Sequence, residues 1–137
     1  MSRVINPHTP GKERNRLKRA MALALRELMK ESEPNVRTRD LVAFIVLALE
    51  GIEKTVELTT TAWEKRDYWI KADRFRLEWE WAGRLEREMR KVVLAQNWDE
   101  IPKVALQVFQ HVGDEKISER HRMGKPWVGA WDEINKT

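Results

Sequence analysis

The strongest constraint on this chain is the absence of helix-breaking residues from its centre. No proline occurs between Pro34 and Pro102, and the only glycines in that stretch are Gly51 and Gly83. In a helix interior, proline costs roughly 3 kcal/mol and glycine roughly 1 kcal/mol relative to alanine. Apolar residues recur through the same stretch at helical spacing, and no segment alternates with the period of two that is typical of strands. The sequence therefore predicts an all-α protein, a single-domain bundle of about four helices.

Length and composition narrow the class further. A chain of 137 residues fits one domain. It contains no cysteine, which excludes disulfides and thiolate metal sites and is compatible with the reducing cytoplasm, where we expect this protein. The first residues lack the apolar core of a signal peptide. The longest apolar run covers residues 41–49, whereas a membrane span needs about 20 residues, so we expect no membrane association.

Capping residues, proline and glycine predict where the helices begin and end. The expected helices cover residues 10 to about 32, about 38 to about 66, about 69 to 96, and about 99 to 113. Thr38 and Asp99 are the expected N-caps of the second and fourth helices. A break near Asp67 creates a long central helical hairpin. A single continuous helix through that point remains the alternative, because no glycine or proline lies beside Asp67.

These helices divide the chain into three parts. Residues 1–9 are expected to form an extended N-terminal arm, residues 10–113 the helical bundle, and residues 114–137 an irregular tail that contains Trp127 and Trp131 and packs on the bundle. Because the tail has no predicted helix of its own, something must cover its tryptophans. They either fold back as a strap or form an exposed peptide for a partner.

Two apolar patterns in the hairpin suggest how it packs. Residues 41–49 are apolar on every side of the helix, so this segment must be enclosed all round. One small bundle does not obviously supply that cover, and dimerisation through this segment is a hypothesis. The helix at 69–96 has two apolar stripes, so it is expected to lie between two neighbours. Trp79 and Trp81 point about 200° apart on such a helix and should not share a neighbour.

A row of cations follows one face of the first helix. We call this row the basic face; it consists of Lys12, Arg16, Arg19, Arg26 and Lys30. The net charge of the chain is +4, and the excess of basic residues lies at the N-terminus, because residues 1–39 hold ten Lys and Arg against four Asp and Glu. A linear row of cations can follow a phosphate backbone. The alternative is a solvated face that keeps the protein soluble.

Glutamates line one face of the second helix. This acidic stripe consists of Glu50, Glu53, Glu57 and Glu64. Carboxylates on facing bundle helices bind metal pairs only together with Glu-x-x-His motifs, and the sequence has none. We therefore predict no metal site. The stripe is expected to be solvated, or to pair with the basic face within the chain or across a dimer.

No motif for catalysis is present. The chain has no cysteine, its serines stand outside any nucleophile motif, and its six glycines are scattered, so neither covalent catalysis nor a phosphate-binding loop is indicated. Seven tryptophans are a marked excess and are expected mainly in the core. The sequence favours a non-catalytic, cofactor-free protein that acts in protein–protein interaction, assembly or self-association. A nucleic-acid-binding subunit that uses the basic face is the alternative.

Overall fold

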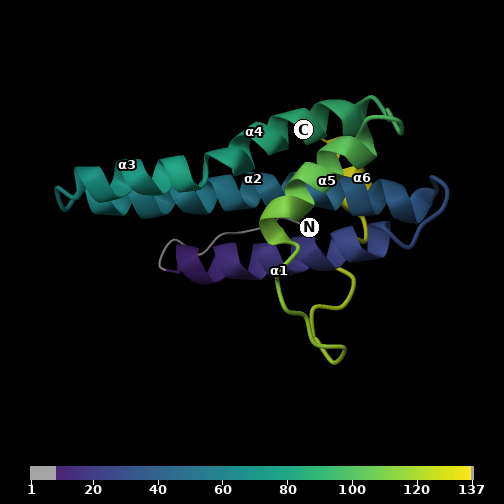
Figure 1. Ribbon diagram of the computed structural model, residues 1–137, viewed down its shortest axis with the longest axis horizontal. Helices are drawn as coiled ribbons and strands as arrows, with labels where there is room; N and C mark the ends of the chain where they lie inside the picture. Colours follow the sequence, from purple (N-terminus) through teal and green to yellow (C-terminus); the bar gives the residue numbers. More distant parts are fainter. Residues whose placement is uncertain (1–8, 137) are drawn as a thin grey trace.

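The structure is a computed structural model and describes residues 9–136 (Figure 1). Its helices are α1 (Pro10–Leu28), α2 (Val36–Glu64), α3 (Trp69–Glu78), α4 (Glu80–Leu94), α5 (Ile101–Val112) and the short α6 (Ala130–Ile134). No strand occurs in this part of the chain. The predicted all-α bundle with a long central hairpin and an irregular C-terminal tail is confirmed. The expected extended arm lies, apart from Thr9, outside the described residues.

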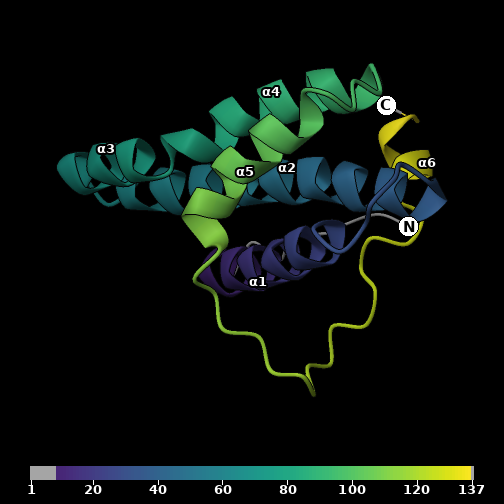
Figure 2. The ribbon, with the colours of Figure 1, turned by 45° about the vertical axis from the view of Figure 1, so that its right-hand side comes forward.

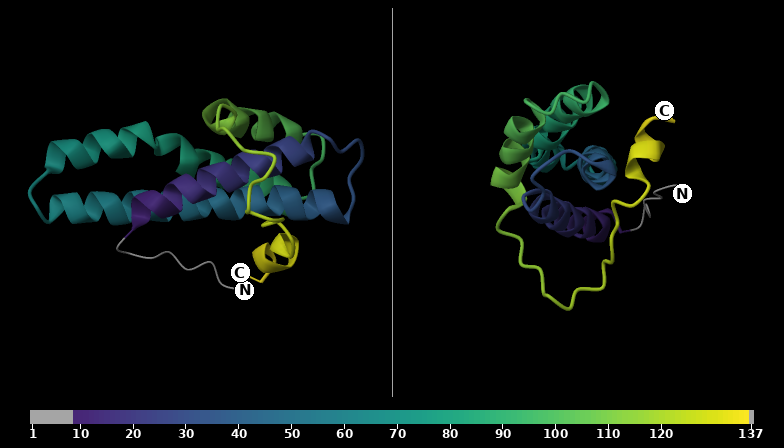
Figure 3. Two further views of the ribbon diagram at one scale, coloured as in Figure 1. Left: turned by 90° about the horizontal axis from the view of Figure 1, so that it is seen from below. Right: turned by 90° about the vertical axis from the view of Figure 1, so that its right-hand side faces the viewer.

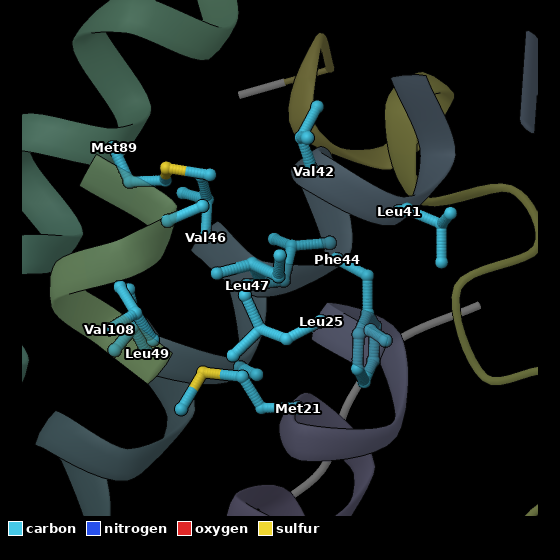
Figure 4. Packing of buried hydrophobic residues seen from close by; sticks show 14 of the residues in the cluster. Met21, Leu25, Leu41, Val42, Phe44, Val46, Leu47, Leu49, Met89 and Val108 are labelled. Carbon is cyan, nitrogen blue, oxygen red and sulfur yellow. The ribbon is translucent and has the colours of Figure 1, made fainter. Parts of the chain in front are cut away.

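The long helix α2 forms the centre of the molecule. Viewed along its axis it is surrounded by α1, by α4 with α5, and by α6 (Figure 3). Every residue from Leu41 to Leu49 is buried. Side chains such as Met21 from α1, Met89 from α4 and Val108 from α5 converge on this run (Figure 4). The chain itself therefore encloses residues 41–49, and the reason for expecting a dimer through them disappears.

The turn between α1 and α2 begins earlier than expected. Helix α1 ends at Leu28 rather than near Ser32, because Lys30 and Glu31 donate to carbonyls only three residues back and tighten the chain into a turn. The N-cap of α2 is Asn35, not Thr38. The Asn35 side chain accepts from the Thr38 backbone N–H at 3.0 Å, and the Thr38 hydroxyl accepts from the Asn35 N–H at 2.6 Å. This reciprocal pair is a capping box.

The predicted hairpin between α2 and α3 is confirmed. The chain reverses at Asp67, whose φ of 63° lies in the left-handed region that aspartate tolerates better than most residues. The Tyr68 N–H donates to the Trp63 carbonyl at 2.9 Å, a closing bond of the kind found at helix ends. The alternative of one continuous helix is thereby excluded.

The predicted uninterrupted helix at 69–96 is wrong, because it breaks at Trp79. Trp79 has φ −107° and ψ 9°, which separates α3 from α4. Beyond the break α4 packs on both α2 and α5, with Ala82 and Gly83 buried. A Cβ on Gly83 would meet the carboxylate of Glu53. Because local propensity favours a continuous helix at these residues, we attribute the break to this tertiary packing.

Helix α5 and the tail complete the bundle. The N-cap position of α5 is Glu100, and the side chain that accepts its N–H is Asn97 at 3.2 Å, so Asp99 is not the cap. From the end of α5 an irregular segment passes around α1 and brings α6 to the opposite side of α2 (Figures 2 and 3). There the Asp40 carboxylate accepts from the backbone N–H of Gly129 at 3.2 Å and of Trp131 at 3.0 Å.

Candidate functional site

The cations of the basic face differ in whether they contact another group within the described residues. Lys12, Arg16 and Arg19 are exposed on α1, and Lys30 is exposed in the turn that follows it. Two of them have carboxylate partners one turn away: Arg16 pairs with Glu13, and Lys30 with Glu27 at 2.7 Å. Neither Lys12 nor Arg19 forms an ion pair with any residue in 9–136. Exposed pairs of this kind are weak, so an anionic ligand can compete for Arg16 and Lys30.

Arg26 has a different role from the rest of the basic face. Its guanidinium is half-buried and donates to the backbone carbonyl of Gly113 at 3.3 Å and to that of Glu115. These carbonyls lie at and just beyond the C-terminal end of α5, where a cation also interacts favourably with the helix dipole. Arg26 thus joins α1 to the end of α5 and is not a free cation on the surface.

The acidic stripe pairs with arginines of the hairpin, not with the basic face. Glu64 contacts Arg76 at 2.8 Å, Glu53 contacts Arg87 at 3.9 Å, and Glu50 contacts Arg90. In each pair the two residue numbers add to 140. A constant sum means that α3 and α4 run antiparallel to α2 in one register. The Arg76 guanidinium hydrogen-bonds the Glu64 carboxylate and lowers its pKa. The expected pairing with α1 is therefore wrong for these three glutamates, and Glu57 is simply exposed.

A row of aromatic rings connects four helices. Trp63 and Phe75 lie 5.1 Å apart between centroids, Phe75 and Trp79 6.1 Å, and Trp79 and Trp81 5.6 Å. Trp81 then stacks on His111 of α5, with the ring centroids 4.1 Å apart. Because the helix breaks at Trp79, Trp79 and Trp81 contact each other. Beyond that contact they have different neighbours, as predicted: Trp79 lies against Arg14 of α1, and Trp81 against His111 of α5.

The side of this aromatic row that faces α1 is covered by Arg14. Its guanidinium carbon lies 4.7 Å from the Phe75 centroid and 5.5 Å from that of Trp79. The same group donates to the hydroxyls of Thr55 and Thr59, each at 3.3 Å. Burial lowers the pKa of Arg14, and the charge of Glu78 partly opposes that effect. This cation–π contact fixes α1 against the hairpin.

The tryptophans of the tail lie against the bundle. Trp127 is buried within the core, and Trp131 is partly buried. The guanidinium carbons of Arg37 and Arg39 lie 5.8 Å from the ring centroids of Trp127 and Trp131, respectively. Of the two alternatives for this segment, the structure shows the strap rather than an exposed peptide.

The largest exposed apolar side chains gather at the tip of the hairpin. Tyr68, Trp69, Ile70 and Leu77 are 51%, 55%, 70% and 78% exposed. Helix α3 and the end of α2 project beyond the start of α1 (Figure 1). Ile70 and Leu77 are one heptad apart and lie within about 20° of each other on the helix, on the side away from Ala72, which is fully buried.

Sequence analysis assigned Ile70 and Leu77 to a covered stripe. They are exposed because α5 packs on α4 and α1 and does not reach α3. We call the side of α3 formed by Ile70, Asp73, Arg74 and Leu77 its outer face. No helix of residues 9–136 covers the outer face. The signal available in the sequence was the length of the last predicted helix, which is too short to cover both α3 and α4.

Comparisons and searches for other kinds of site give no assignment. No family model, no curated protein and no solved structure matches this chain. Within residues 9–136 no group of three or more His, Asp or Glu side chains is arranged to hold a metal ion. None of the helices in this part of the chain is long and apolar enough to span a bilayer. The outer face of α3 is therefore the strongest candidate surface.

Proposed function

We propose that this protein is a non-catalytic assembly protein that associates through the outer face of α3. The observation that supports this proposal is the exposure of Ile70 and Leu77, at 70% and 78%. Two large apolar side chains on one face of a projecting helix, about two turns apart, are typical of helix–helix association. Ion pairs of the acidic stripe and the aromatic row join α3 and α4 to α2, and Arg14 of α1 contacts Phe75 of α3, so α3 is anchored along the side opposite its outer face.

The pattern of residues on this face favours a second copy of the same chain. If two α3 helices pack antiparallel about a two-fold axis, Ile70 of each copy meets Leu77 of the other. The same axis places Asp73 of each copy opposite Arg74 of the other, so both the apolar and the charged residues are complementary. Such an isologous interface uses one patch twice. Arg74 forms no ion pair with any residue in 9–136, and Asp73 contacts Arg76 at 3.3 Å at the surface.

Sedimentation equilibrium of the full chain tests this association. An interface built from one short helix is small, so we expect a dissociation constant on the order of 100 μM, and measurements from about 10 μM to about 1 mM cover that range. Leu77→Ser should leave the protein monomeric. Leu106→Ser is the matched control, because Leu106 is 60% exposed and lies on α5, away from the outer face.

Charge exchange gives a sharper test. Asp73→Arg alone and Arg74→Asp alone should each weaken the dimer, because each places like charges opposite one another. The double variant restores opposite charges across the axis and should recover association. Circular dichroism checks that all variants keep the helical fold. A protein that stays monomeric up to about 1 mM, or a double variant no better than the singles, would refute this mode of assembly.

Nucleic-acid binding is the second candidate function, favoured by the exposure of Lys12 and Arg19, which form no ion pair within the described residues 9–136. With Arg16 and Lys30 added, four cations of the basic face are available to a phosphate backbone, since Arg26 is occupied. The slope of log affinity against log salt for duplex DNA should then be about −3.6 at the steepest. Mobility shifts with generic DNA and RNA at two salt concentrations test this, and no shift at low salt excludes it.

A further inference from the structure

A second surface feature lies at the other end of α1. A pocket of about 460 Å³ is enclosed by the C-terminal end of α1, the connection to α2, and α5 with the residues before it. Its volume falls within the range of about 300–1,000 Å³ found for small-molecule sites. Its walls are mainly apolar and include the rings of Trp98 and Phe109. Met29 and Leu106, at 63% and 60% exposed, form part of the rim.

The charged residues at this pocket are acidic. Among residues 9–136, the only ionisable residues that line it are Glu31 and Glu33. Glu31 has a partner outside the pocket, since Arg37 contacts its carboxylate at 2.5 Å. Glu33 is exposed and forms no ion pair with any residue in 9–136. Within the described part of the chain, Glu33 is therefore an acidic residue without a counter-ion in the lining of an apolar concavity.

We propose that this pocket binds a small amphiphile with an apolar body and a protonated amine. The apolar walls would take the hydrocarbon part, because removal of apolar surface from water is the main source of affinity for such ligands. The Glu33 carboxylate would receive the ammonium group, and the hydroxyl of Ser32, also in the lining, would accept a hydrogen bond from it. The same carboxylates disfavour anionic amphiphiles such as fatty acids. This site is separate from the outer face of α3.

Three probes of equal chain length test the proposal on the full chain. Octylamine, octanol and octanoate differ only in the head group, and isothermal titration calorimetry with amide chemical-shift mapping reports both affinity and location. Octylamine should bind about tenfold more tightly than octanoate, which corresponds to about 1.4 kcal/mol. The perturbed amides should lie around Met29, Ser32 and Leu106. Equal affinity for octylamine and octanoate would overturn the charge assignment.

Two variants and two controls locate the interactions. Glu33→Gln should bring the affinity for octylamine down to that for octanol, whereas Glu119→Gln, an exposed glutamate outside the pocket lining, should leave it unchanged. Leu106→Ser should weaken octylamine and octanol alike, about five- to tenfold. Leu77→Ser should abolish dimerisation and leave octylamine binding intact, so the two proposals fail independently. No binding of octylamine, or shifts confined to another surface, would overturn the site.

Discussion

Replacing Asp40 by alanine tests how the C-terminal strap is held on the bundle. The two carboxylate oxygens of Asp40 accept the backbone N–H groups of Gly129 and Trp131. A hydrogen bond to a charged group contributes about 1.5–3 kcal/mol. Asp40 is only half-buried, so the lower part of this range applies to each bond. We expect Asp40→Ala to destabilise the docking of α6 by about 2–3 kcal/mol, and Asp40→Asn, which keeps one acceptor oxygen, by about half as much.

The effect should be local before it is global. Helix α6 and the turn before it bury Trp127, Ala130 and Ile134, and these side chains separate from α2 when α6 undocks. Hydrogen exchange followed by mass spectrometry should show peptides over residues 126–136 exchanging about 30-fold faster in Asp40→Ala, the factor that corresponds to about 2 kcal/mol. Exchange in α1 and in the middle of α2 should stay close to that of the unmodified protein.

Asp99→Ala is the matched control for this experiment. Asp99 resembles a helix cap in the sequence, but in the structure the N-cap position is Glu100, whose N–H is accepted by the Asn97 side chain. Its removal should change stability by less than about 0.5 kcal/mol, as for other surface substitutions. If Asp40→Ala exchanged like the unmodified protein, or if α2 lost protection as much as α6 did, the assignment of Asp40 as the local anchor would be wrong.

Three further predictions concern the aromatic row and the basic face. Trp79→Ala should lower the free energy of unfolding in urea by about 3 kcal/mol, whereas Trp69→Ala, at an exposed ring, should change it by less than about 0.5 kcal/mol. Burial and, to a lesser extent, the charge of Arg84 lower the pKa of His111 in the folded protein. As the pH falls, His111 is therefore protonated in the unfolded state at a higher pH than in the folded state. The contribution of neutral His111 to the free energy of unfolding is present above about pH 6.5 and is lost as the pH falls below it. An NMR titration of His111 that gave a pKa above 6.5 would contradict this sign. Arg26→Gln should lower the melting temperature, whereas Arg19→Gln should not, and equal effects would contradict the structural role of Arg26.

The parts of the fold that depend on local signals are predictable from the sequence. The absence of proline and glycine predicts long helices, and the hairpin turn near Asp67 follows from the length that two paired helices require. The enclosure of residues 41–49 is also predicted, because a segment that is apolar on every side needs cover. What supplies that cover is not predictable from the segment itself, and α1, α4, α5 and α6 of the same chain prove sufficient.

The features that depend on register and on the reach of neighbouring elements were missed. The break at Trp79 accompanies the packing of α4 on both α2 and α5, which local propensity does not encode. Glu50 and Arg90 lie 40 residues apart in sequence, and their pairing requires the register of the hairpin. Once the turn is placed, however, the regular spacing of glutamates on α2 and arginines on α3 and α4 predicts that pairing. Ile70 and Leu77 are exposed because α5 is too short to cover α3 as well as α4.

The path of the segment between α5 and α6 sets an order of folding events. This segment passes around α1 before α6 reaches α2, and the anchor at Asp40 meets Trp131 across 91 positions of sequence. Contacts of such long separation form after local helices and hairpins, because closing the chain over that distance is entropically unfavourable until both ends have a surface to join. Helix α6 should therefore dock after the rate-limiting step. A variant that weakens the anchor should then unfold faster, while its rate of folding stays the same.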